Sequence, residues 1–196
     1  MKISKGERTR ENILLKALEL YAEKGVQNTP FQNIADAVGI TQAALYKYFS
    51  DRDELLKEAI LLGAQRGRDF FASKVPDNLN AKESLLIYVE KNLEWCSKGQ
   101  PFHVAFLSLH YFATQVPSIK KVHTEVMRAR LAKIQELLLA GQEAKVWKPQ
   151  DLESTAMSIH NYLLGEMFSV INNPQMETKK ARNERVSTAV LKLVKD

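Results

Sequence analysis

Three consecutive small or polar residues at positions 42–44 have the chemistry needed to read a DNA base. Gln42 offers both a hydrogen-bond donor and an acceptor to the edge of a base. Ala43 and Ala44 are small enough to let the backbone approach the methyl group of thymine. Together these residue types indicate a surface that contacts bases in a groove of double-stranded DNA.

The residues that follow suit the phosphate backbone instead. Tyr46, Lys47 and Tyr48 supply two hydroxyls and an ammonium group, all of which bind phosphate oxygens. Arg52 lies just past a turn, where the start of the next helix would add backbone amides and a positive dipole end to its guanidinium. The same residues also fit two packing tyrosines and an ordinary surface lysine, so this alternative stays open.

Two short helices separated by Gly39 must position this surface. Thr29 is predicted to cap the first helix, with Pro30 at its first position and Gln32 completing a capping box. Gly39 can take the positive φ that ends a helix, and Thr41 is predicted to cap the second helix. We expect Thr29 and Thr41 to contact DNA as well.

The apolar residues of the two helices fall on their inner sides. Small Ala35 would let the helices cross closely, and the residues expected to face inward are Ile34, Val38, Ile40, Leu45 and Phe49. This pattern predicts a helix-turn-helix over residues 30–49, whose second helix enters the major groove.

The rest of the chain predicts an all-α fold of about nine helices with no sheet. Apolar residues recur at helical spacing, and prolines fall between the periodic segments. The segment 102–107 could be read as a strand, but the helical spacing of its apolar residues and Pro101 before it favour a helix. We expect a DNA-binding domain over residues 1–51 and a larger helical domain over residues 52–196.

Composition excludes several classes of protein. Of the 196 residues, 45% are hydrophobic and 26% charged, which is typical of a globular protein. The net charge of +5 is compatible with a polyanionic partner. Cys96 alone cannot form an internal disulfide or a cysteine-rich zinc site. Without a membrane-spanning stretch or a secretory signal, the expected location is the cytoplasm.

The stretch from Ile13 to Leu56 resembles the N-terminal domain of the tetracycline-repressor (TetR) family of transcriptional regulators. The matching residues are Ile13, Leu14, Ala17, Leu18, Glu19, Leu20, Tyr21, Lys24, Gly25, Val26, Ile34, Ala35, Val38, Gly39, Ile40, Leu45, Tyr46, Tyr48, Phe49, Arg52, Asp53, Glu54, Leu55 and Leu56. This spacing is specific because it couples a preceding helix, the turn and the start of the following helix. Outside it, the family shares length and helical architecture more than sequence.

Three positions depart from the family pattern. Pro30 stands where the family often has Ser or Thr, so the usual hydroxyl contact to phosphate passes to Thr29 or is lost. Arg52 stands where Lys is common, which keeps the charge but changes its geometry. Lys145 stands where a second glycine often follows the one at Gly141.

The resemblance implies a homodimer that reads a palindromic operator in double-stranded DNA. One helix-turn-helix covers about half of such a site, so symmetric pairing supplies the second reading head. The helix over residues 151–171 is apolar on two sides and must be covered on both. The interface is expected at Leu152, Ala156, Ile159, Leu163, Val186, Val190 and Leu193. The alternative is that these residues form the core of a monomer.

The middle helices resemble the ligand-binding domain of the family. Bulky residues with a few polar tips are typical of sites for small apolar or amphipathic molecules, although ordinary cores have the same composition. The candidates are Trp95, Phe102, Phe106, His110, Tyr111, Met127, Tyr162 and Met167. His103 and His110 are two turns apart, too far for the usual chelating pair, so we expect no metal.

The function predicted from these patterns is a ligand-released transcriptional repressor without a cofactor. No nucleophile elbow, phosphate-binding loop, dinucleotide fingerprint or metalloprotease motif is present in the sequence, so we expect no enzyme. The alternative is a helical carrier or binding module for small molecules that does not act on DNA. An enzyme with an unrecognised helical active site is a third and more remote possibility.

Overall fold

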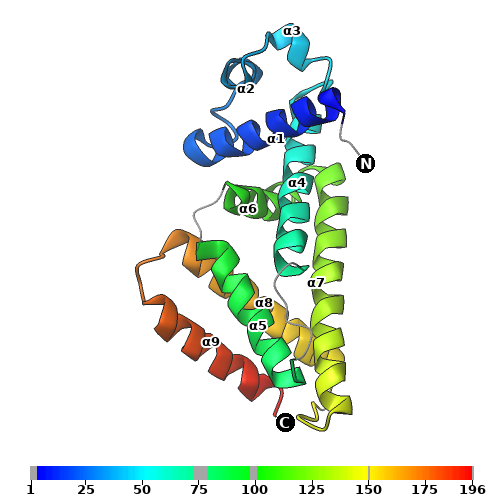
Figure 1. The fold of residues 1–196 in the computed structure, drawn as a ribbon, viewed down its shortest axis with the longest axis vertical. Coiled ribbons are helices and arrows are strands. Elements are labelled where there is room, and N and C mark those ends of the chain that lie inside the picture. The colour runs from blue at the N-terminus through cyan, green and yellow to red at the C-terminus, as the bar shows by residue number, and fades with distance from the viewer. Residues whose placement is uncertain (1–3, 73–78, 98–100, 150, 196) are drawn as a thin grey trace. The chain divides into compact units, whose positions relative to one another are not determined.

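The computed structural model describes residues 4–72, 79–97, 101–149 and 151–195. Within these residues it contains nine α-helices and no strand, which confirms the all-α prediction (Figure 1). The helices are α1 (Lys5–Lys24), α2 (Phe31–Val38), α3 (Gln42–Leu45), α4 (Arg52–Ala72), α5 (Ala81–Ser97), α6 (Phe102–Phe112), α7 (Pro117–Glu143), α8 (Leu152–Asn172) and α9 (Lys179–Leu193).

The chain folds into two compact units. The first comprises Met1–Gly67 and Gln100–His123, and the second comprises Arg68–Gly99 and Thr124–Asp196. A boundary between the units therefore falls inside α4 and another inside α7. The domain boundary expected between residues 51 and 52 lies where the DNA-binding sequence pattern ends, whereas these units are defined by compactness. That domain boundary stays a prediction.

Helix α1 organises the first unit. It begins with a capping box, in which the Glu7 amide donates to Ser4 Oγ at 3.2 Å and the Ser4 amide donates to the Glu7 carboxylate at 2.8 Å. The pKa of Glu7 is lowered by these hydrogen bonds. Helix α1 packs against α2 and α6, and its buried face consists of Ile13, Leu14, Ala17, Leu18 and Tyr21.

Helix α6 confirms the helical interpretation of the segment that could also have been a strand. It begins directly after Pro101, and Ala105, Leu109 and Phe112 lie buried at a spacing of about one turn. That period places all three on one face, which an alternating strand could not do.

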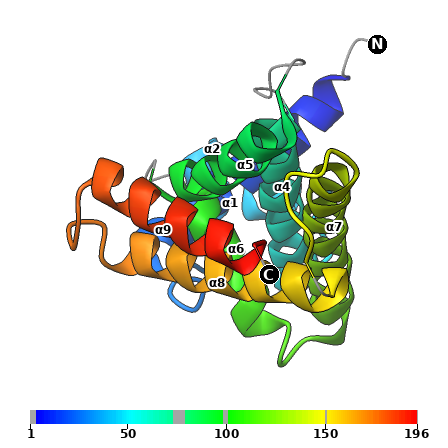
Figure 2. The same ribbon diagram turned by 90° about the horizontal axis from the view of Figure 1, so that it is seen from below.

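The second unit is built around α5, α8 and α9, which pack against one another (Figure 2). The N-cap of helix α8 is Asp151, whose carboxylate accepts from the amides of Glu153 at 2.9 Å and Ser154 at 3.3 Å. The core of this unit includes Leu85, Val89 and Leu93 from α5, Ala156, Ile159, Leu163, Met167 and Val170 from α8, and Val186 and Val190 from α9.

This packing corrects the expected dimer interface. Ala156, Ile159, Leu163, Val186 and Val190 are fully buried within a single chain, so they cannot meet a second one. The monomer-core alternative is the right one for these five side chains, because the apolar stripe they share is covered by the chain's own helices.

The ends of the predicted interface behave differently. Leu152 is half-buried, and Leu193 is exposed. A second apolar row on α8 also remains uncovered, since Met157 is exposed and Leu164 and Ile171 are half-buried.

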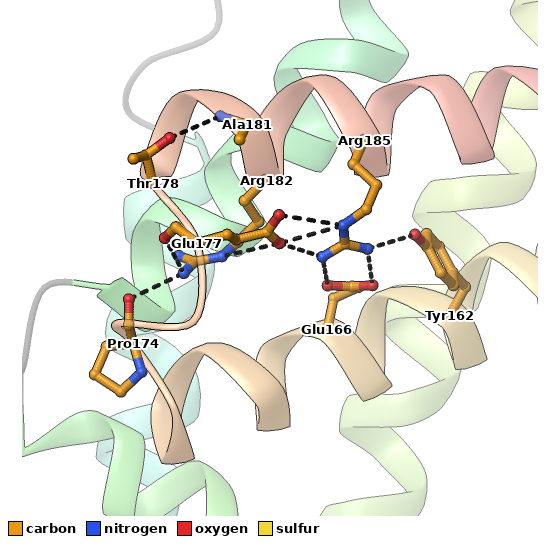
Figure 3. Close-up of polar contacts among 8 residues, drawn as sticks. All are labelled: Tyr162, Glu166, Pro174, Glu177, Thr178, Ala181, Arg182 and Arg185. Atoms are coloured by element: carbon orange, nitrogen blue, oxygen red, sulfur yellow. Dashed lines mark hydrogen bonds and ion pairs between the residues drawn. The ribbon is translucent and has the colours of Figure 1, made fainter.

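A polar network fixes the connection between α8 and α9 (Figure 3). Arg185 donates to both carboxylate oxygens of Glu166, at 2.6 and 2.9 Å, and to the carboxylate of Glu177. These carboxylates raise the pKa of Arg185, and its guanidinium lowers the pKa of Glu177. Buried Arg182 donates to the carbonyls of Pro174 at 3.1 Å and Glu177 at 3.2 Å. The loop is therefore held at both helices by charge-assisted hydrogen bonds.

Candidate nucleic-acid interface

The turn between α2 and α3 has the conformation predicted from the sequence. Gly39 adopts φ 77° and ψ 34°, the left-handed region that disfavours residues with a Cβ. Its amide and that of Ile40 reach back to carbonyls near the end of α2, the Ile40 amide at 3.0 Å from Ala35 O. Thr41 Oγ1 then accepts from the Ala44 amide at 3.1 Å, which confirms it as the cap of α3.

A buried set of side chains holds α3 in place. Ile34, Ala35, Leu45 and Phe49 are at most 1% exposed. The predicted inner residues Val38 and Ile40 are half-buried at the edge of this core. Because Leu45 anchors the inner side of a four-residue helix, the other side of α3 faces solvent.

The solvent side of α3 and of the turn after it carries the predicted DNA-contact residues. Thr41, Ala43, Tyr46 and Lys47 are exposed, while Gln42, Ala44 and Tyr48 are half-buried. Tyr46 is 52% exposed although one face of its ring lies 5.0 Å from the ring of Phe31, measured between centroids. We call the residues 41–44 and 46–48 the α3 surface. Its role in DNA binding stays a prediction.

Thr29 corrects the predicted start of α2. The N-cap is Pro30, and no side chain caps the helix. Thr29 is fully buried, and its hydroxyl donates to the carbonyls of Gly25 at 2.8 Å and Leu20 at 3.4 Å. Gln32 donates instead to Asp36 Oδ1 at 2.6 Å, so the capping box is absent. Thr29 satisfies carbonyls near the end of α1 and does not face a DNA ligand.

Arg52 lies at the start of α4, as predicted, but part of its guanidinium is engaged. One nitrogen donates to the carbonyl of Val26, in the loop after α1. Arg52 thereby ties the start of α4 to that loop. Its remaining donors are compatible with a phosphate contact, which stays a prediction.

Sequence reasoning missed the contribution of Arg10. Its guanidinium lies 4.5 Å from the centroid of the Phe49 ring and donates to the carboxylate of Glu58, at 2.7 Å for Nη2 and Oε1. This contact joins α1, the end of the helix-turn-helix and α4. Nothing in the sequence indicates that Arg10 stacks on the ring of Phe49.

The predicted ligand-binding residues divide between the two units. In the first, the rings of Phe106 and His110 are half-buried with centroids 4.5 Å apart. Tyr111 is 59% exposed and is therefore not part of a buried pocket wall, which corrects that prediction. The side chain of Phe102 lies outside the described part of the structure.

The remaining four candidates lie in the second unit. Trp95 and Met167 are buried, and Met127 and Tyr162 are half-buried. The Tyr162 hydroxyl accepts from Arg185 at 3.2 Å, so it belongs to the network in Figure 3. The ligand site itself stays a prediction.

A buried polar cluster beside Met167 was also missed. Arg130 Nη2 donates to Asn92 Oδ1 at 2.8 Å and to Met167 Sδ at 3.3 Å. Asn92 sits on the same helical stripe as the buried Leu85, Val89 and Cys96. A polar residue at a core position was the available signal, because buried amides need partners.

Two searches of the described residues gave negative results. None of the described helices is long and apolar enough to cross a membrane. The described His, Cys, Asp and Glu side chains form no group of three or more that could hold a metal ion.

Known proteins resemble the chain in both sequence and fold. The sequence model of "Bacterial regulatory proteins, tetR family" matches residues 13–59. A relative is the HTH-type transcriptional regulator AcrR of Shigella flexneri, 25% identical over 188 residues that cover 92% of this chain and 87% of AcrR.

Solved structures reproduce the fold over nearly the whole chain. A protein described as a transcriptional regulator from Saccharomonospora viridis, solved with choline, has a TM-score of 0.87 and 19% identity, covering 96% of this chain and 98% of its own. AibR, solved with isovaleryl coenzyme A and operator DNA, has a TM-score of 0.72 and 20% identity, covering 95% and 97%. The match over the helix-turn-helix, the relative aligned over most of the chain and the shared fold agree: residues 13–59 match the tetR family of bacterial regulatory proteins, and the chain is similar to transcriptional regulators of that family.

Proposed function

We propose that the protein is a dimeric transcriptional repressor that binds a palindromic operator and is released by a small ligand. The observation that carries this proposal is the α3 surface. A short helix is anchored from behind by Leu45 and Phe49, and it presents exposed Ala43, Tyr46 and Lys47 together with Gln42. The match of residues 13–59 to the tetR family supports the same function.

The α3 surface divides the work of DNA recognition between bases and phosphates. Gln42 reads a base edge in the major groove, and Ala43 allows the close approach this requires. Tyr46 and Lys47 bind phosphate oxygens and fix the register of the helix on the duplex. Because Thr41 is tied to the Ala44 amide, it holds the first turn of α3 rigid against the groove.

The dimer forms through the outer face of α8 rather than through the buried stripe expected from the sequence. Met157, Leu164, Phe168 and Ile171 are exposed or half-buried, and their spacing of seven, four and three residues places them on one side of the helix. A second copy would cover this row and bring a second α3 surface to the operator.

A ligand bound by the larger helical part would act by favouring one arrangement of the two reading heads over another. It can release DNA only to the extent that it binds the released state more tightly. AibR was solved with both an acyl coenzyme A and operator DNA, and that pairing supports a ligand-responsive function here. The protein would act by binding rather than by catalysis, in the cytoplasm.

The test begins with selection of the preferred operator from random duplexes. Its affinity for the full-length protein is then measured by mobility shift across a salt series. We expect log K to fall linearly with log salt, because phosphate contacts release counterions. Tyr46→Ala with Lys47→Ala should abolish specific binding while the circular-dichroism spectrum stays unchanged.

Lys121→Ala is the matched control. Lys121 is an exposed lysine of the same unit, on α7 and away from the α3 surface, so its removal changes charge alone. Equal loss of affinity in this control, or a selection that yields no preferred sequence, would reject DNA recognition by the α3 surface.

A further inference from the structure

Arg130 is a partly buried cation without an acidic partner. It lies on α7 in the second unit, where Nη2 donates to Asn92 Oδ1 and Met167 Sδ. Its Nε is buried and forms no hydrogen bond. Among the described residues, no carboxylate pairs with its guanidinium. Both of its protein partners are therefore neutral.

Arg182, in the same unit, is by contrast paired with a carboxylate. Arg182 is 5% exposed, donates to the carbonyls of Pro174 and Glu177, and lies 3.9 Å from the Glu177 carboxylate. A desolvated charge is costly unless it is paired and hydrogen-bonded. Arg182 is paired within the chain, whereas the partly buried Arg130 is hydrogen-bonded but has no described carboxylate as partner.

Buried neighbours hold the guanidinium of Arg130 in position. Met167 is fully buried, and so is Asn92, whose Nδ2 donates to the Tyr88 carbonyl at 2.7 Å. This second bond fixes the amide so that Oδ1 faces Arg130. Cys96 also lies nearby, in a setting so desolvated that burial raises the pKa of its thiol to about 12 despite the positive charge of Arg130. A partly buried cation is thus oriented, but not neutralised, beside the buried side chains of Asn92 and Met167.

We propose that the ligand of the second unit carries a carboxylate that pairs with Arg130, joined to an apolar body that packs near Met167 and Trp95. This inference rests on the ligand-responsive function proposed above and names the chemistry of its ligand. A guanidinium binds a carboxylate through parallel N–H bonds, and the unpartnered Nε–H is one of the donors available. The same charge repels a cationic ligand and gives no advantage to a neutral one.

The direct test uses calorimetric titration of the full-length protein with three probes of equal chain length: octanoate, octan-1-ol and octyltrimethylammonium. We expect octanoate to bind more tightly than the alcohol by at least about tenfold and the ammonium probe not to bind. Arg130→Met should remove the preference for octanoate, and Arg130→Lys should retain part of it. Arg128→Met, an exposed arginine on the same helix, should bind octanoate as the unaltered protein does.

Each of three binding results would overturn the proposal: no binding of octanoate, equal or tighter binding of the ammonium probe, or an unchanged octanoate affinity in Arg130→Met. Since Arg130→Met leaves Asn92 Oδ1 without its donor, the double variant Arg130→Met/Asn92→Leu is measured beside it. That variant replaces the polar pair with apolar side chains of similar size, a change that is often neutral or stabilising.

The melting temperature of the ligand-free double variant separates binding from structure. We expect it to equal or exceed that of the unaltered protein, while octanoate binding is lost and operator binding is kept. A clear fall in melting temperature would assign the cluster a structural role and overturn the proposal. Octanoate that binds through Arg130 but leaves operator affinity unchanged would reject ligand-driven release, while the assignment of Arg130 would stand.

Discussion

At the scale of single residues, Lys145 in the loop after α7 adopts a backbone conformation that suits glycine better than lysine. Lys145 has φ 55°, the left-handed region that costs a residue with a Cβ roughly 1 to 2 kcal/mol. The tetR-family pattern often has glycine at this position, and the geometry gives the physical reason. Lys145 is exposed, and its side chain forms no hydrogen bond with a described residue that would offset this strain.

Lys145→Gly should therefore stabilise the protein by about 1 kcal/mol, because glycine adopts this conformation without strain. The greater freedom of glycine in the unfolded chain reduces the gain. Urea unfolding followed by circular dichroism measures the free energy of unfolding. Lys145→Ala removes the same side chain but keeps the Cβ, so it should leave the stability nearly unchanged. Equal stabilities of the two variants would contradict the strain argument.

At the scale of elements, α3 depends on its cap more than a longer helix would. It has four residues, and Thr41 Oγ1 satisfies the amide of Ala44. Short helices are marginal on their own, so the cap, Gly39 and the buried Leu45 share the task of holding this one. Thr41 caps α3, and its side chain also belongs to the exposed α3 surface that we propose binds DNA.

Three substitutions at Thr41 separate these two roles. Thr41→Ala should lower the free energy of unfolding by about 1 kcal/mol and weaken operator binding, because the amide loses its acceptor. Thr41→Ser should preserve both properties. Thr41→Asp should keep the stability, as Asp is a good N-cap, yet weaken operator binding through repulsion from phosphates. Chemical unfolding and mobility shift provide the two measurements, and full operator affinity in Thr41→Asp would remove this position from the DNA interface.

The elements of the helix-turn-helix were predictable where local backbone chemistry decides the outcome. Gly39 and Thr41 act through bonds to their sequence neighbours, and both predictions are confirmed. Thr29 was not predictable in the same way, because its hydroxyl found carbonyls of α1 that lie before it in the chain. Arg130 and Asn92 come from different helices, so only the folded chain shows that they meet.

At the scale of the whole molecule, the sequence predicted an all-α chain but assigned to the partner a row of α8 that the chain covers itself. This helix carries two apolar rows, and periodicity alone does not tell which one the chain covers itself. In the folded protein, α5 and α9 cover the row of Ala156, Ile159 and Leu163. The row that contains Met157 and Leu164 is the one that we propose a second copy covers.

Leu164→Arg should convert the proposed dimer into a monomer, because it places a charge in the centre of the uncovered row. Sedimentation equilibrium over a range of protein concentrations measures the change in mass. Operator affinity should fall with it, since each monomer carries one reading head. Ala132→Arg adds the same charge at an exposed site on α7 and should leave the dimer intact. A dimer that persists in Leu164→Arg would place the interface elsewhere.

The two tryptophans of the chain give the second unit an intrinsic optical label. Trp95 is buried on α5 with its ring centroid 5.2 Å from that of Phe70, and buried Trp147 donates from Nε1 to the Leu138 carbonyl at 2.9 Å. Residues 1–67 and 100–123 contain no tryptophan. Tryptophan fluorescence excited at the red edge of the absorption band therefore reports on the second unit alone. An event at α3 changes this fluorescence only if it alters the surroundings of Trp95 or Trp147.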